Sequence, residues 1–185
     1  MIKKPLIQMI ALCAFALTAS AQDTNAMKTL IGVFEAQTGV TIVKGFGQVG
    51  SVSMGAAVIS VRSKETADAG SGHKVYGLGV EIEANPLPKQ RILIDDDEID
   101  SLLAGMDYLL KISYDVTSLP SFEASYTTKS GLRVFAYSVR KNGGIQMFLQ
   151  YGDYPRIALS STQLSQLYGL IDQASKNLTA LKTGK

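Results

Sequence analysis

Apolar and polar residues follow two different periods along this chain. Over residues 75–83, apolar side chains alternate with glycine and glutamate, and this period of two predicts a strand with one buried face. Over residues 99–110, apolar side chains recur every three or four positions, which predicts a helix with one apolar stripe. The stripe consists of Ile99, Leu102, Leu103, Met106, Leu109 and Leu110. We expect this stripe to pack on the apolar face of the sheet.

The junction between strand and helix occurs twice. Residues 91–110 (RILIDDDEIDSLLAGMDYLL) and 156–175 (RIALSSTQLSQLYGLIDQAS) align without a gap. Each has a short strand, a capping residue and an apolar stripe, and each follows a hairpin pattern. We therefore predict an α+β fold of two repeated units, residues 22–111 and 112–185, forming one compact domain or a pseudo-dimer. Each unit has about four antiparallel strands followed by one helix, and the helices pack on the sheets.

Three segments leave room for more than one interpretation. Ile31–Ala36 is predicted as a strand because a turn ending in Gly39 follows it, although Met27, Leu30, Ile31 and Phe34 also fit one helical face. Ser63–Lys74 is polar throughout and predicts a loop of a dozen residues. The glycines at 45, 47, 50 and 55 precede a strand pattern rather than a helix, so they indicate bulges or tight bends and not a phosphate-binding loop.

The first 21 residues have the pattern of a secretory signal peptide. Lys3 and Lys4 precede an apolar run, and Ala19-Ser20-Ala21 is a small-x-small cleavage site. Leu12 stands directly before Cys13, where a lipoprotein signal has a small residue, so lipidation is not expected. We predict export to the periplasm or the extracellular space. No second long apolar run occurs, so no membrane span is predicted.

Charge and cysteine content limit the possible functions. Residues 22–185 contain no cysteine, which excludes disulfides and thiolate metal sites there. Residues 22–111 carry 8 basic and 12 acidic side chains, whereas residues 112–185 carry 8 basic and 4 acidic ones. The two halves therefore have net charges of −4 and +4. Because these cancel, general binding of nucleic acid or of anionic membranes is not indicated, although the second unit alone is basic.

Two residue clusters are candidate sites. Asp95, Asp96 and Asp97 are weak candidates for a cation site, since carboxylate oxygens are the ligands that Ca²⁺ prefers. They also suit the positive end of a helix dipole, with Asp95 as the cap, and this interpretation is favoured. His73 is the only histidine and has no nucleophile motif near it, so neither a catalytic residue nor a cofactor is predicted.

Aromatic and cationic residues mingle in the second unit. Arg133, Arg140 and Phe148 are weak candidates for ligand binding, because ring stacking combined with cations binds single-stranded nucleic acid. Phe135 and Tyr137 alternate with polar residues and are assigned to the core instead. Phe148 lies between two glutamines, which places it on the polar face.

The tandem of four strands plus a helix, over roughly residues 40–181, resembles the Whirly-type fold in element order. Members of that family bind single-stranded DNA, so the resemblance implies such binding as one possibility. The plant proteins carry a Lys-Gly-Lys-Ala-Ala-Leu motif, from which Lys44-Gly45-Phe46-Gly47 differs. Residues 95–112 also look like exported bacterial proteins of unknown function.

Three functional hypotheses follow from these observations. The first is an exported, non-enzymatic binding or interaction module for an unknown protein or small molecule. The second is binding of single-stranded nucleic acid by the basic second unit. The third, ranked lowest, is an enzyme of unrecognised type.

Overall fold

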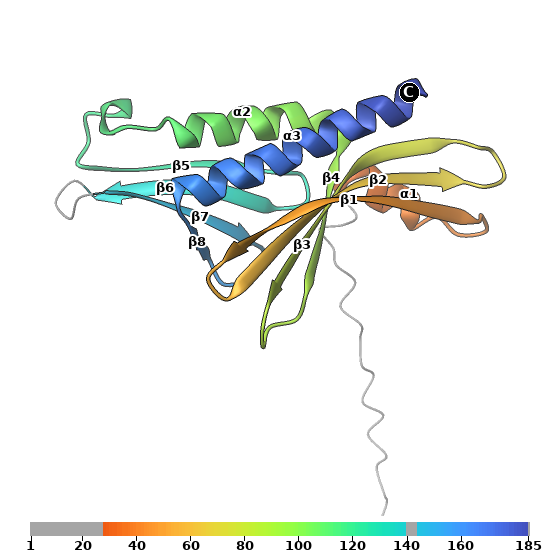
Figure 1. The fold of residues 1–185 in the computed structure, drawn as a ribbon, viewed down its shortest axis with the longest axis horizontal. Helices are drawn as coiled ribbons and strands as arrows, with labels where there is room; N and C mark the ends of the chain where they lie inside the picture. The colour runs from red at the N-terminus through yellow and green to blue at the C-terminus, as the bar shows by residue number, and fades with distance from the viewer. Residues whose placement is uncertain (1–27, 140–143, 185) are drawn as a thin grey trace, which may run out of the picture.

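The computed structural model describes residues 28–139 and 144–184 of the chain (Figure 1). Two four-stranded antiparallel sheets follow one another along the sequence, in the orders β1-β2-β3-β4 and β5-β6-β7-β8. The first contains β1 (Ile42–Met54), β2 (Ala57–Asp68), β3 (Lys74–Ala84) and β4 (Gln90–Asp95). The second contains β5 (Ser121–Thr127), β6 (Leu132–Val139), β7 (Ile145–Tyr151) and β8 (Ile157–Leu159). The predicted α+β fold of two repeated units is confirmed.

Three α-helices and two 3-10 turns complete the described residues. The helices are α1 (Leu30–Glu35), α2 (Ile99–Leu110) and α3 (Ser161–Thr183), and the turns are η2 (Asp96–Glu98) and η3 (Tyr114–Val116). Both long helices start where a strand ends, as the repeat predicts, and Ser160 and Gln163 form a capping box at α3. None of the helices in this part of the chain combines the length and the hydropathy that crossing a membrane requires.

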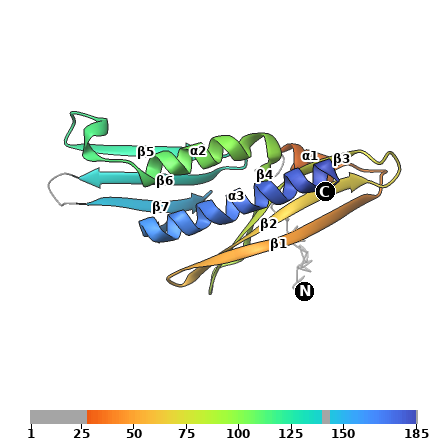
Figure 2. The same ribbon diagram turned by 45° about the horizontal axis from the view of Figure 1, so that its top comes forward.

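The two long helices lie on the same side of the sheets, and each covers the sheet of the other unit (Figures 1 and 2). Helix α3 packs over β1, β2 and β3, while α2 packs over β5 and β6. Gly50 of β1 makes room for α3, because a Cβ there would lie 2.7 Å from Leu170 Cδ2. Gly105 of α2 is equally close to β5, where a Cβ would lie 2.8 Å from the Tyr126 side chain.

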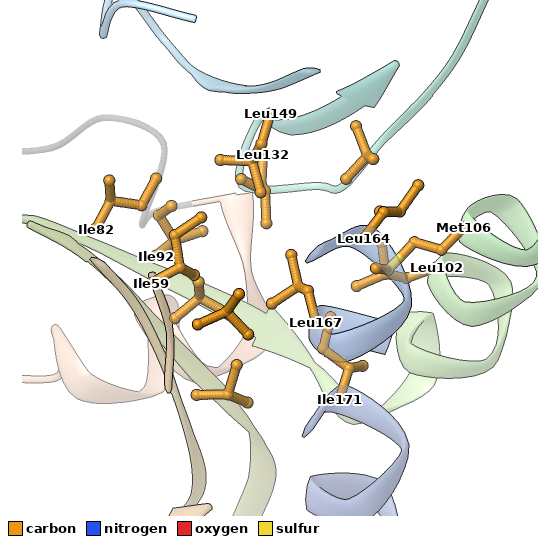
Figure 3. Packing of buried hydrophobic residues seen from close by; sticks show 14 of the residues in the cluster. Ile59, Ile82, Ile92, Leu102, Met106, Leu132, Leu149, Leu164, Leu167 and Ile171 are labelled. Carbon is orange, nitrogen blue, oxygen red and sulfur yellow. The ribbon is translucent and has the colours of Figure 1, made fainter. Parts of the chain in front are cut away.

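One hydrophobic core therefore joins both units. Buried residues of both sheets and both long helices form a single cluster (Figure 3). The labelled members are Ile59, Ile82, Ile92, Leu102, Met106, Leu132, Leu149, Leu164, Leu167 and Ile171. The face of β3 predicted to be apolar contributes Leu78, Val80 and Ile82 to this core. Neither α2 nor α3, the two long helices of the described residues, lies on the opposite, outer faces of the sheets.

The prediction of a strand over Ile31–Ala36 is wrong, because α1 occupies this segment. Thr29 caps the helix by accepting a hydrogen bond from the Gly32 N–H at 3.0 Å. Asp95 accepts two more, from the N–H groups of Leu30 at 2.7 Å and Ile31 at 3.1 Å. A helix of six residues is too short to be stable alone, so this cap from a distant part of the chain is what fixes it.

The prediction of a long loop over Ser63–Lys74 is also wrong. Strand β2 continues to Asp68, and Ala67 pairs with Lys74 of β3, which leaves only residues 69–73 as the turn. The polar side chains of this half of β2 have partners inside the fold. Ser63 Oγ donates to the Ala174 carbonyl of α3 at 3.2 Å, and Lys64 and Thr66 bind Glu35 of α1. The expected irregularities are confirmed at Gly50, by a bulge between Gln48 and Gly50, and at Gly55, by its positive φ. At Gly45 and Gly47 the expectation is wrong, because both pair in regular register within β1.

Candidate functional site

The acidic stretch after β4 forms a structural junction. The Asp95 side chain is almost fully buried, and besides the two amides of α1 it binds Lys129 Nζ at 3.3 Å. Asp97 binds the same ammonium at 2.5 Å, and Asp96 binds Lys182 Nζ at 2.8 Å. All three candidate cation ligands therefore have lysine partners. Over the described residues, no group of three or more His, Cys, Asp or Glu side chains is arranged to hold a metal ion.

Glu98 completes this junction from the inside. Its Oε1 accepts a hydrogen bond from the Asp95 N–H at 3.1 Å, and its Oε2 accepts one from the Lys129 N–H at 2.8 Å. Burial raises the pKa of the Glu98 carboxyl, and these two bonds offset the rise only in part. The acidic stretch thus ties together α1, β4, α2 and the turn between β5 and β6, which is more than the solvated helix start predicted from the sequence.

Phe135, Tyr137 and Phe148 lie on the outer face of the second sheet. The prediction that Phe135 and Tyr137 belong to the core face is therefore wrong. Leu132, Val134 and Ala136 form the core face of β6, so Phe135 and Tyr137 point to the other side. Both faces of β6 are apolar, and for this reason alternation alone does not show which one meets the helices. Phe148 lies on the outer face as predicted, directly opposite Phe135.

These rings stack on one another. Phe148 stacks with Phe135 at a centroid distance of 5.4 Å and with Tyr137 at 5.2 Å. The Arg133 guanidinium lies 4.5 Å from the centre of the Phe135 ring and pairs with Glu123. Phe135 is only 2% exposed as a result. The rings and Arg133 therefore already have partners within the sheet, and Arg140 lies outside the described residues.

A second outer surface, missed by the sequence analysis, carries a groove of about 510 Å³ on the first sheet. Its lining comes from α1 and all four strands: Glu35, Lys44, Phe46, Arg62, Lys64, Glu81, Arg91 and Leu93. The strand register brings these residues together, since Phe46 pairs with Lys64, and Glu81 pairs with Arg91. We call this feature the charged groove.

Two glycines of β3 decide where the charged groove is open. Gly77 is covered by α1, because a Cβ there would lie 2.4 Å from Ile31 Cδ1 and 2.2 Å from the Ile94 carbonyl oxygen. Gly79 lies between Arg62 and Leu93 across the sheet, and a Cβ there would meet nothing within 4 Å. On the outer face of the first sheet, α1 therefore fills the space at Gly77, while the space above Gly79 is open and forms the floor of the groove.

Cations outnumber carboxylates in and around the charged groove. Glu35 binds Lys44 Nζ at 2.7 Å and Lys64 Nζ at 2.5 Å. Glu81, which is nearly buried, pairs with three cations, Arg62, Lys89 and Arg91. Glu83 at the rim shares Lys89. Five cations thus face three carboxylates, and the excess positive charge is held next to the open floor.

Burial changes the ionisation of the pair at one end of the groove. It lowers the pKa of the Lys64 ammonium, and Glu35 offsets this effect only in part. Burial also acts to raise the pKa of the Glu35 carboxyl, but the hydrogen bonds from Lys44, Lys64 and Thr66 prevail and the pKa is lowered. Half-exposed Phe46 lies above both neighbouring cations, with its ring centre 5.4 Å from the Arg62 guanidinium and 5.1 Å from Lys64 Nζ.

Comparisons with protein-family models, with curated proteins and with solved structures found no match to this chain. The similarity to the Whirly-type fold therefore stays a resemblance of element order.

Proposed function

We propose that this protein is an exported, non-enzymatic binding module that holds a small organic anion in the charged groove. The observation that carries the proposal is the excess of cations around an open floor at Gly79. The groove volume of about 510 Å³ falls within the range of roughly 300–1,000 Å³ typical of small-molecule sites. Export is proposed from the pattern of residues 1–21.

The lining indicates the chemical class of the ligand. Arg62 and Arg91 lie on β2 and β4, the strands on the two sides of β3. A guanidinium binds a carboxylate or phosphate through two parallel hydrogen bonds. Phe46 and Leu93 offer apolar surface on the two sides of the floor. A ligand with one acidic group and an apolar body fits both features. Glu35 and Glu81 are held in ion pairs, so we assign them to positioning the cations and not to acid–base chemistry.

The proposal can be tested with 8-anilinonaphthalene-1-sulfonate, a fluorescent anion with an apolar body. We expect the folded protein to bind it at one saturable site, with an affinity that falls as salt is added. Gly79→Leu fills the floor without altering a charge and should weaken binding by about tenfold or more. Gly169→Leu is the matched control, because Gly169 lies on an exposed part of α3 with nothing within 4 Å of its added Cβ.

Two further measurements sharpen the test. Competition by phenylacetate against phenyl phosphate distinguishes a carboxylate ligand from a phosphate ligand. Circular dichroism of each variant shows whether the fold is intact, since the dye also binds unfolded protein. Unchanged dye binding in a folded Gly79→Leu variant would refute the proposed site. Binding of single-stranded nucleic acid through Arg133, Arg140 and Phe148 stays a prediction.

A further inference from the structure

Strand β1 has a free edge. It is the outermost strand of the first sheet and pairs only with β2 (Figure 2). It spans 13 residues, Ile42–Met54. At its C-terminal end β8 contacts it and the Ser53 carbonyl accepts a hydrogen bond from Gln163 at 2.9 Å, but over residues 42–50 no other strand of the described residues pairs with its outer side. Every second residue of an edge strand points its N–H and C=O away from the sheet, and such a row is a template for another strand. The N–H and C=O groups of a second extended strand can therefore hydrogen-bond to this row.

Apolar side chains gather along this same edge. Val43 and Phe46 of β1 are each 55% exposed, and Leu181 near the end of α3 is 54% exposed. A hollow of about 230 Å³ lies beside Leu181, where Gly45 and Gly47 leave the inner face of β1 without side chains. An edge strand with exposed apolar residues and an adjacent apolar hollow is typical of an interaction site.

We propose that β1 pairs in antiparallel register with β1 of a second copy of this chain, about a two-fold axis at Gly45. This register places Val43 opposite the partner's Gly47, so that each valine enters the hollow of the other copy. It also places Lys44 opposite the partner's Phe46, where the ammonium lies over an aromatic ring as Lys64 does within one chain. The pairing is closed, because the same patch serves both copies.

Neighbouring registers are less favourable for stated reasons. A shift by one residue would set the inner face of one strand against the outer face of the other, which breaks the pleat. An axis at Lys44 would place two lysines directly opposite each other, and like charges in that position repel. An axis at Phe46 would place Val43 opposite the partner's Val49 instead of Gly47, so that no side chain would fill the hollow. Only the axis at Gly45 fills the hollow and pairs the cation with the ring.

Lys44 and Phe46 belong to both the charged groove and this pairing, but Val43 and Gly79 each belong to one of them, so variants at these two positions let each proposal fail alone. The mass of the full chain in solution, measured by light scattering over a range of concentrations, should approach that of a dimer. Val43→Glu should raise the dissociation constant at least about tenfold, because it places a second carboxylate in a hollow that Glu65 already lines. Leu119→Glu is the control, since Leu119 is also an exposed apolar residue, at 64%, but lies in the loop before β5. A monomer at every concentration, or a dimer unaffected by Val43→Glu, would overturn the proposal.

A cross-link tests the register without weakening the interface. In a Cys13→Ser background, Gly45→Cys should oxidise to a covalent dimer, since the two cysteines face each other on the axis. A Cβ at Gly45 has no contact closer than 3.8 Å, so the strand accommodates it. Ser51→Cys on the same strand should stay monomeric, because its opposite residue in this register lies before β1. Equal cross-linking at both positions, or none at Gly45→Cys, would contradict the register.

Discussion

At the scale of single residues, Asp95 has the largest structural role of the acidic stretch. Its carboxylate accepts hydrogen bonds from the N–H groups of Leu30 and Ile31 and pairs with Lys129. A buried carboxylate without such partners would destabilise the fold by several kcal/mol, on the order of an unpaired buried charge. The same side chain therefore ends β4, fixes the start of α1 and holds the turn that precedes β6.

We expect Asp95→Ala to lower the free energy of unfolding by about 2–4 kcal/mol, because it leaves the N–H groups of Leu30 and Ile31 without their acceptor and removes one of the two carboxylates that bind Lys129. Asp95→Asn should cost less, since an amide oxygen still caps one N–H but forms no ion pair with Lys129. Asp100→Ala, at an exposed position in the first turn of α2, should change stability by less than about 0.5 kcal/mol. Urea unfolding compares the three variants. Equal effects of Asp95→Ala and Asp100→Ala would contradict the assigned role.

At the scale of elements, the sequence predicts those strands and helices that bury one face and expose the other. Strand β3 and helix α2 each follow a single period, and that period predicts both of them. Helix α1 is not predicted in this way, because besides the local Thr29 cap it depends on hydrogen bonds to Asp95 and on packing at Gly77, both far along the chain. The second half of β2 resembles a loop locally, since the partners of Ser63 and Lys64 lie on α3 and α1.

The charged groove could not be predicted for the same physical reason. Its residues come from five elements and meet only once the strand register is known. One local signal does exist, because Arg62 and Lys64 are two residues apart, as are Glu81 and Glu83. This period of two places like charges on one face of each strand. In β2 this signal is hard to recognise, because the polar composition of Ser63–Lys74 favours a loop.

The close contact between α2 and β5 provides a prediction at this scale. Gly105→Ala should lower the free energy of unfolding by about 1–3 kcal/mol, since its Cβ would lie 2.8 Å from the Tyr126 side chain and push the helix away. Gly169→Ala on α3 should raise it by about 0.5–1 kcal/mol, because alanine favours a helix and that position is open. Thermal unfolding measures both changes. The same sign for the two variants would contradict the described packing.

At the scale of the whole molecule, the exchange of helices decides how the two units depend on each other. In chain order, α2 closes the first unit and α3 closes the second. In space, α3 covers β1, β2 and β3, and α2 covers β5 and β6. Each sheet therefore has its apolar face buried by a helix of the other unit. The repeat in the sequence describes the order of elements, but the stable structure is a single core.

Leu167 of α3 tests this dependence. It is fully buried in the cluster that joins both sheets (Figure 3), and Leu167→Ala should lower the free energy of unfolding by about 2–5 kcal/mol. Because the core is shared, protection of backbone amides against hydrogen exchange should fall by the same free energy in β3 and in β6. Gln166→Ala, at an exposed position of the same helix, should change little. Loss of protection confined to one sheet would mean that the two units unfold separately, in spite of the helices they exchange.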